Sequence, residues 1–407
     1  MKAILEQYRR EQEQELEQIL DYWMHYTIDH DQGGFFGKID HDNVAYPDAP
    51  KGVVLNCRIL WTFSAACIQT GKNEYRKMAD RAFDYIIKYF IDSDFGGVYW
   101  SVDHEGQPLE TKKQIYALAF AIYGLSEYYL LSRIEESKTA VINLYETIEK
   151  YSHDPINGGY FEALTREWNS IDDLRLSSKD ANEQKSMNTH LHVLEAYSNL
   201  YRIWPDEKLK LKIFQVITIF LDHIIDKKTN HLILFFNEEW NSKSDIISYG
   251  HDIEAAWLIQ EAAETIGDEN LVNLVKQQSL EIAKAAIEGL DEDGGLWYEY
   301  DQTSHHLIKE KHWWPQAEAM VGFFNAWQIQ GNPSTLNHSL QSWEFTKTHM
   351  KDAAKGEWYW GVREDYSVMK EQDKVGLWKC PYHNGRACIE LIRRITASLK
   401  TPYNDEK

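Results

Sequence analysis

Three histidines stand at equivalent places in three similar stretches of the chain, and together they could move a proton. His192 lies in KSMNTHLHVLEAY, His251 in SYGHDIEAAW and His383 in GLWKCPYHNGRAC. An imidazole titrates near neutral pH, so it can both take and return a proton. Arg58, in VVLNCRILWTF, adds a fixed positive charge that can stabilise an oxyanion beside the reacting carbon. This set of residues is suited to acid/base catalysis on a small molecule.

Other polar and aromatic residues in the same regions are candidate contacts for that molecule. They are Tyr116, Asp180, Asn188, Glu254, Trp257, Trp314, Glu318 and Trp378. Each also has a purely structural interpretation: Glu254 could be the ion-pair partner of Arg58, and His190 is predicted to be a core histidine. Two-residue spacing directs His190 and His192 to different sides of a helix. Burying so many ionisable groups for stability alone would nevertheless be costly.

The same histidines could in principle bind a transition metal, as three-histidine sites do. Against this, each of the three has aromatic neighbours suited to stacking on a sugar face. The chain contains no G-x-G-x-x-G loop, no P-loop and no H-E-x-x-H motif, which are the usual signatures of nucleotide and zinc-protease sites. We therefore expect neither a metal nor a cofactor.

A short motif that recurs six times must position these residues. Each copy ends a predicted helix, turns at a glycine or asparagine, and continues into aromatic residues. Successive turns are 63, 62, 72, 64 and 62 positions apart, and asparagine fits the fourth because it also accepts a left-handed turn. The turn residues are Gly33, Gly96, Gly158, Asn230, Gly294 and Gly356. A fixed period of this length indicates one supersecondary unit used repeatedly.

Each unit is predicted to contain an amphipathic outer helix, a short β-hairpin and an apolar inner helix. In the second unit Tyr75, Ala79, Ala82 and Phe83 form one stripe, whereas IYALAFAIYGLSEYY is apolar on most sides. Six such pairs predict an all-α fold, an (α/α)6 barrel, as a single domain over residues 1–407. An open solenoid would need polar capping repeats, yet the last inner helix is as apolar as the others. The parallel inner helices should bring all six N-termini to one mouth.

Composition narrows the class of partner. Lys and Arg number 43 and Asp and Glu 64, a net charge of −21, which argues against nucleic acid or an anionic membrane. No apolar run is expected to approach membrane-spanning length. Four cysteines without metal spacing and a charged start predict a cytoplasmic protein. We expect a small-molecule partner and a monomer or weak homodimer.

Five stretches closely resemble cellobiose 2-epimerases of the N-acylglucosamine 2-epimerase superfamily: LNCRILWTFSAA and the regions of the three histidines, together with WWPQAEA. The resemblance covers nearly the whole chain and implies an (α/α)6 barrel. It also implies the activity: inversion of C2 in the reducing-end sugar of β-1,4-linked disaccharides, through an enediol(ate) and without a cofactor.

Residue roles follow from the resemblance alone. It implies that His251 and His383 are the acid/base pair, that Arg58 steadies the enediolate oxygen and that His192 assists. Glu254 could orient His251 or bind the sugar. By the same resemblance Tyr116, Asp180, Asn188 and Glu318 are sugar ligands or supporting groups, and Trp314 and Trp378 stack on the rings.

Three alternatives remain open at this level. The first is an aldose–ketose isomerase such as a mannose isomerase. The second is a glycosidase that uses a carboxylate pair from Asp180, Glu254 and Glu318. The third is a non-catalytic binding barrel. Two insertions, residues 164–185 and 363–376, precede the mouth and could wall the pocket, or be ordinary solvated loops.

Overall fold

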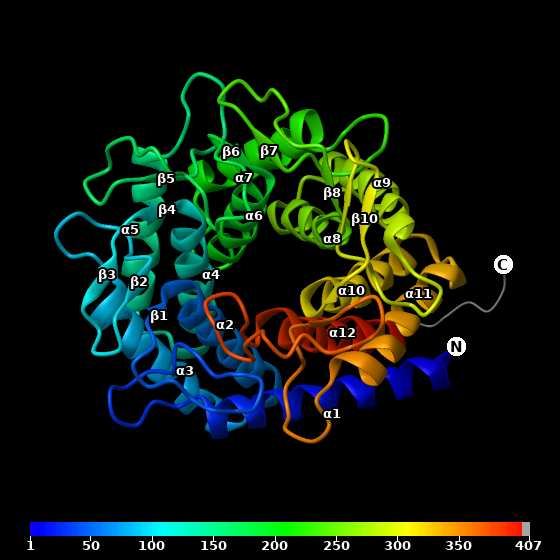
Figure 1. Cartoon of the computed structure of the whole chain (residues 1–407). Helices are drawn as coiled ribbons and strands as arrows, with labels where there is room; N and C mark the ends of the chain where they lie inside the picture. Colours follow the sequence, from blue (N-terminus) through cyan, green and yellow to red (C-terminus); the bar gives the residue numbers. More distant parts are fainter. Residues whose placement is uncertain (401–407) are drawn as a thin grey trace.

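The computed structural model describes residues 1–400, which contain twelve α-helices that alternate between an outer and an inner ring (Figure 1). The outer helices are α1 (Lys2–Tyr26), α3 (Asn73–Tyr85), α5 (Glu135–Tyr151), α7 (Glu207–Ile219), α9 (Glu269–Ala286) and α11 (Pro333–Phe345). The inner helices are α2 (Val53–Thr70), α4 (Ile115–Ser132), α6 (Met187–Tyr201), α8 (Tyr249–Ile266), α10 (Trp313–Gln330) and α12 (Tyr382–Lys400).

The inner ring is closed. Each inner helix packs on the next, from α2 through α4, α6, α8 and α10 to α12, and α12 packs back on α2. The outer helix α1 packs on α12, so the first and last helices of the chain lie side by side. The predicted (α/α)6 barrel is confirmed.

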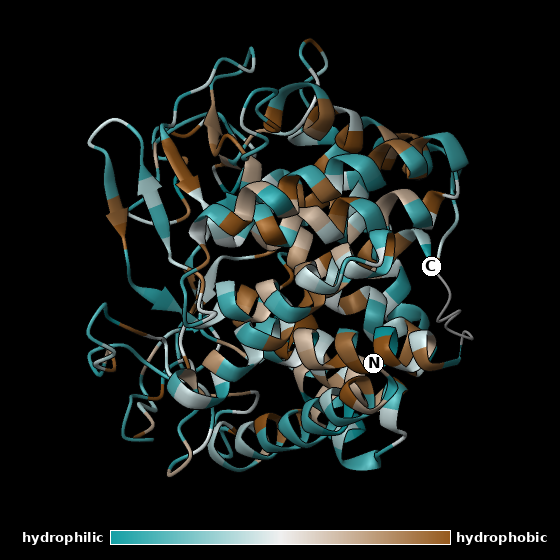
Figure 2. Ribbon diagram, turned by 90° about the vertical axis from the view of Figure 1, so that its right-hand side faces the viewer, coloured by the Kyte–Doolittle hydropathy of each residue, from teal (hydrophilic) through white to brown (hydrophobic). Residues whose placement is uncertain are grey.

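Hydropathy explains the two rings, as the mixed colouring of the surface helices in Figure 2 illustrates. On α3 the residues Tyr75, Ala79, Ala82 and Phe83 are buried as predicted, and the charged residues between them face outward. On α4 every residue from 115 to 128 is buried. Such a helix gains free energy on all sides by losing apolar surface to the core.

The expectation that no apolar run approaches membrane-spanning length was wrong for two helices. Both α2 and α4 are long and apolar enough by length and composition. However, 83% of the α2 segment and 78% of the α4 segment are buried inside the protein. Their apolar character is that of core helices in a closed ring.

Short strands gather at one end of the barrel, on the left of Figure 2. They are β1 (Lys51–Gly52), β2 (Ser101–Val102), β3 (Pro108–Glu110), β4 (Lys113–Gln114), β5 (Ala163–Leu164), β6 (Lys185–Ser186), β7 (Phe235–Phe236), β8 (Ile246–Ser248), β9 (Glu299–Asp301), β10 (His306–Ile308), β11 (Lys311–His312) and β12 (Gly361–Val362). Strands that precede an inner helix pair with the following unit, for example β1 with β2 and β6 with β7. The predicted hairpins exist, but these further pairings join neighbouring units.

A buried ion pair that the sequence did not predict fastens turns to inner helices. An aspartate of each turn accepts a hydrogen bond from a buried lysine at 2.7–2.8 Å in five of the six units. The pairs are Asp29–Lys51, Asp92–Lys113, Asp154–Lys185, Asp291–Lys311 and Asp352–Lys374. We call each of these contacts a turn–helix tie.

The two insertions brace the units beside them. In the first, Arg166 forms ion pairs with Asp92 and Asp94 of the second unit. In the second, Lys374 makes the last turn–helix tie, and Val375 forms an antiparallel bridge with Ile39. The second insertion thereby joins the sixth unit to the first.

Candidate functional site

The three histidines meet at the mouth where the inner helices begin. The indole of Trp314 lies 4.6 Å from the His251 ring and 5.7 Å from the His383 ring, measured between centroids. A positive charge on His192 would lower the pKa of both other imidazoles, which places all three rings within electrostatic reach of one another. The predicted gathering of histidines from three distant segments is confirmed.

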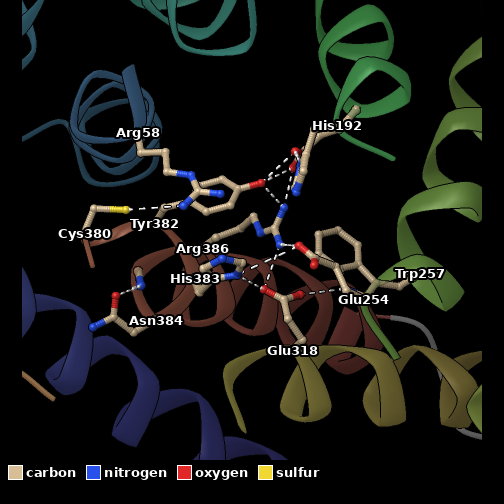
Figure 3. Close-up of polar contacts among 12 residues, drawn as sticks. Arg58, His192, Glu254, Trp257, Glu318, Cys380, Tyr382, His383, Asn384 and Arg386 are labelled. Carbon is tan, nitrogen blue, oxygen red and sulfur yellow. Dashed lines mark hydrogen bonds and ion pairs between the residues drawn. The ribbon is translucent and has the colours of Figure 1, made fainter. Parts of the chain in front are cut away.

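His383 is oriented by a carboxylate from the neighbouring inner helix (Figure 3). Its Nδ1 lies 2.7 Å from Oε1 of Glu318, and both side chains are buried. An ionised carboxylate only accepts, so Nδ1 carries the proton and Nε2 keeps a free lone pair. Burial and the charges of Arg58 and Arg386 hold the pKa of His383 well below its usual value. The ring is therefore a neutral base at pH 7.

His192 is held in a similar way within its own helix. Its Nδ1 lies 3.0 Å from Oε2 of Glu195, one turn later on α6. The ring also packs against Tyr116 and Phe120, at centroid distances of 5.1 and 4.6 Å. The carboxylate again selects the tautomer whose Nε2 is free.

His251 differs because no carboxylate contacts it within the described residues. Its Nδ1 lies 2.8 Å from the hydroxyl of Ser248, the residue that precedes α8. Burial, together with the nearby His192, lowers the pKa of His251 to about 3. This histidine is thus also neutral, and its orientation depends on the first turn of its own helix.

Arg58 reaches the same space from α2. Its Nη2 donates to the Tyr116 hydroxyl at 2.7 Å, and its guanidinium lies 4.1 Å from the Phe120 ring centroid. Nε of Arg58 is buried without a hydrogen-bond partner among the described residues. A buried donor of this kind is available to an oxygen of a bound ligand.

Arg386 is a central residue of the site that the sequence analysis did not identify, as are Glu195 and Ser248. Its guanidinium donates to Glu254 at 2.5 Å and to Glu318 at 2.7 Å, and also pairs with Glu195 (Figure 3). It therefore connects the carboxylates that hold His192 and His383. The signal available in the sequence was its spacing, because Arg386 follows His383 by three residues on the same helix face.

Glu254 has a different partner from those considered in the sequence. It pairs with Arg386 rather than Arg58, and its Oε1 lies 3.9 Å from His383 Nδ1. Burial, reinforced by the charge of Glu318, raises the pKa of Glu254 to about 7. It contributes to the surroundings of His383 and makes no hydrogen bond that would orient His251.

Three of these groups lie at a spacing that a metal ion could bridge. Ligand atoms of Glu254, Glu318 and His383 are all within 4.8 Å of one another. The Arg386 guanidinium donates to both carboxylates, so a positive charge already lies between them. A dication would have to displace or oppose that guanidinium.

The remaining predicted residues lie in three different places. Trp378 packs at 5.9 Å from Tyr116, and Asn188 has a buried Oδ1 without a partner among the described residues; both lie at the mouth. Trp257 is 1% exposed and donates to Glu318 at 3.1 Å, so it supports the site from behind. Asp180 lies in the first insertion and accepts from the Ser177 amide at 2.8 Å.

His190 is a core histidine, as its spacing from His192 predicted. It is fully buried, its Nδ1 lies 2.7 Å from the Ser186 carbonyl, and its Nε2 accepts from the Tyr160 amide at 2.9 Å. Both ring nitrogens are therefore used by the backbone.

Comparison with known proteins defines the class. The N-acylglucosamine 2-epimerase (GlcNAc 2-epimerase) family matches residues 33–387, so the chain belongs to this family and is an isomerase of the epimerase kind. The cellobiose 2-epimerase of Bacteroides fragilis is 50% identical over 385 residues, covering 94% of this chain and 98% of the relative.

A solved structure agrees with this assignment. The cellobiose 2-epimerase from Bacillus thermoamylovorans B4167 superposes with a TM-score of 0.91 at 38% identity, covering 96% of this chain and all of that one. The D-mannose isomerase of Marinomonas mediterranea is 22% identical over 400 residues, covering 94% of this chain and 97% of the relative. Similarity is thus greater to the 2-epimerases than to this isomerase.

Proposed function

We propose that the protein epimerises C2 of the reducing-end sugar in β-1,4-linked disaccharides, converting cellobiose to glucosyl-mannose and lactose to epilactose. The observation that carries the proposal is the placement of two neutral imidazoles, His251 and His383, against one indole, Trp314. The 50% identity to a cellobiose 2-epimerase supports the substrate class.

The chemistry begins on the open-chain sugar, whose C1 aldehyde acidifies the C2–H bond. Nε2 of one histidine takes the C2 proton, and the bonding electrons move to the aldehyde oxygen to give an enediolate. The other histidine, whose Nε2 has taken a proton from solvent, donates that proton to C2 from the opposite face while the aldehyde re-forms. The first histidine then releases the abstracted proton to solvent, so both rings return to their starting states. The product is the C2 epimer, and no electrons enter or leave the molecule.

Arg58 and His192 stabilise the charge that develops. A guanidinium donor near the reacting oxygens stabilises the enediolate more than the neutral aldehyde, and this difference lowers the barrier. His192 has a free Nε2, packs against Tyr116 and serves the same oxygens or ring opening. The indoles of Trp314 and Trp378 supply flat apolar faces for the sugar rings.

Solvent deuterium provides the test. In deuterated buffer the enzyme should place deuterium at C2 of both cellobiose and glucosyl-mannose, because a proton taken by an imidazole exchanges with solvent. His383→Ala should abolish labelling while circular dichroism and thermal unfolding stay close to those of the wild type. An enzyme that incorporates no deuterium into any disaccharide would refute the proposal.

The closest rival reaction returns the proton to C1 rather than C2 and yields a ketose. Cellobiose, lactose and mannose should be incubated separately and their products resolved by chromatography. We expect epimeric disaccharides as the main products. Fructose formed from mannose as the dominant product would favour a mannose isomerase, and free glucose from cellobiose would favour a glycosidase.

A further inference from the structure

The fourth unit departs at two positions from the pattern that the first, second, third and fifth units share. The residue two places before the inner helix is lysine in the first, second, third and fifth units but Ile247 in the fourth. The residue after the turn glycine is itself glycine in those same four units. In the fourth it is His231, which follows Asn230. The usual turn–helix tie is therefore replaced.

His231 makes the replacement contact. Its Nδ1 lies 2.7 Å from Oδ2 of Asp252, and its Nε2 lies 3.4 Å from Glu288. Asp252 is fully buried, and its Oδ1 accepts from the Leu232 amide at 2.8 Å. Together with the Tyr249 ring at 6.0 Å, these are the groups that face His231.

The imidazole of His231 carries the charge that lysine carries elsewhere. Burial opposes that charge, but the hydrogen bonds and negative charges of Asp252 and Glu288 outweigh burial and raise its pKa. The fourth tie is thus also an ion pair, but its polarity is reversed: the turn supplies the cation, His231, and the inner helix supplies the anion, Asp252. It also differs in that the partner of the turn residue, Asp252, lies within the inner helix α8 itself.

Asp252 follows His251 directly in the first turn of α8. His192 and His383 each have a carboxylate on Nδ1, whereas His251 has the Ser248 hydroxyl. The equivalent serine of α6, Ser186, caps its helix by accepting from the Thr189 amide, but Ser248 makes no such capping bond. The orientation of His251 therefore depends on what fixes the start of α8.

We propose that the buried His231–Asp252 pair is a positioning device for His251, fixing the first turn of α8 so that this imidazole faces the reacting carbon. The inference rests on the proposed function. His231 and Asp252 act through His251 and do not touch the substrate.

The sixth unit supports the inference independently. Its turn also carries a long side chain, Glu357, in place of the second glycine. Oε1 of Glu357 accepts from Asn384 at 2.7 Å and from Lys379 at 2.7 Å. Asn384 follows His383 directly, just as Asp252 follows His251. The two units that carry the proposed acid/base pair thus both hold the next residue through their turn.

The kinetic test compares His231→Leu with His231→Asn. Leucine removes the donor, and we expect kcat for cellobiose to fall about 10- to 100-fold with KM nearly unchanged, since small displacements of a catalytic group have effects of this size. The asparagine amide can donate from nearly the place of Nδ1, so His231→Asn should recover most of the lost rate.

Lys51→Met is the matched control. It breaks a turn–helix tie of the same kind, Lys51–Asp29, in a unit that carries no acid/base histidine. It should lower the thermal unfolding midpoint, yet keep wild-type kcat when assayed well below that midpoint. Equal losses of kcat in Lys51→Met and His231→Leu, or wild-type kcat in His231→Leu, would overturn the inference.

A measurement without substrate separates this inference from the proposed function. In protein labelled with 15N-histidine, the His251 ring signals are assigned by their loss in His251→Ala. His231→Leu should shift or broaden those signals and leave the His383 signals unchanged. Unchanged His251 signals would overturn the positioning role even if the enzyme epimerises disaccharides. Shifted signals in an enzyme without epimerase activity would support positioning and refute only the function.

Discussion

Oε1 of Glu318 lies 2.7 Å from Nδ1 of His383, and the same oxygen accepts from Arg386 at 2.7 Å. One carboxylate oxygen thus fixes the tautomer of an imidazole, while the Arg386 guanidinium opposes the rise that burial causes in the pKa of that carboxyl. The arrangement joins α10 to α12 at the point where the inner helices enclose the mouth. It explains why a buried acid can be tolerated beside a neutral base.

Glu318→Gln should therefore inactivate the enzyme without unfolding it. Glutamine is close in size, but its amide can present a donor to Nδ1 and favour the wrong tautomer. We expect epimerisation of cellobiose to slow by about 100-fold or more, because catalysis requires the free lone pair on Nε2. The rate of deuterium labelling at C2 measures this, and a wild-type rate would contradict the role given to Glu318.

Arg386→Met should be costly for stability as well as for activity. It removes the shared partner of Glu195, Glu254 and Glu318, all of which are buried. Breaking a buried ion pair from one side typically costs about 3–5 kcal/mol, so chemical denaturation should show a loss of at least that order. Arg394→Met, which also removes an arginine from α12 but one bonded to Glu390 nearer the end of the helix, should cost less.

The fold could be predicted from the sequence because its determinants are local and periodic. The turn residues Gly33 and Asn230 have φ angles of +82° and +62°, which glycine and asparagine accept, and the apolar periods fix which helix faces inward. The mouth histidines could be predicted too, since a polar residue at the start of an apolar helix is conspicuous.

Partnerships between buried charges could not be predicted in the same way. Arg386 reads as one basic residue in a helix, and its partners Glu195 and Glu254 lie 191 and 132 positions away. The lysines of the turn–helix ties do recur two places before four inner helices, a signal that was present. Only the three-dimensional structure shows that each of these lysines forms an ion pair with an aspartate of its own turn.

Acid should inactivate the enzyme at a lower pH than the titration of free imidazole would suggest. Burial and the nearby His192 lower the pKa of His251 to about 3, and that of His383 is also well below its ordinary value. The acid limb of kcat/KM, which reports the free enzyme, should therefore lie below the ordinary value of about 6.5. A profile of kcat/KM against pH that is half-maximal near 6.5 would contradict neutral histidines in the empty site.

The same depressed values affect stability. Below about pH 6.5 histidines of the unfolded chain bind protons, whereas His251 and His383 in the folded protein remain neutral. The free energy of unfolding should therefore fall as the pH drops from 6.5 toward 3. His251→Asn should flatten this dependence, because asparagine does not titrate. Thermal unfolding at a series of pH values measures both slopes. Equal slopes in the two proteins would show that His251 does not contribute.

Chelation provides the last test, and its outcome follows from the position of Arg386. The cluster of Glu254, Glu318 and His383 has ligand atoms within 4.8 Å of one another, a composition and spacing that could bind a metal ion. However, the guanidinium donates to both carboxylates, and Nδ1 of His383 is occupied by Glu318. A metal would have to displace these bonds and face a fixed positive charge, which costs more than exposed carboxylates would demand. Prolonged dialysis against EDTA should leave the rate of C2 labelling unchanged, and added Mn²⁺ or Zn²⁺ should not raise it. Loss of activity on dialysis that a divalent ion restores would show instead that Arg386 yields its place to a metal during catalysis.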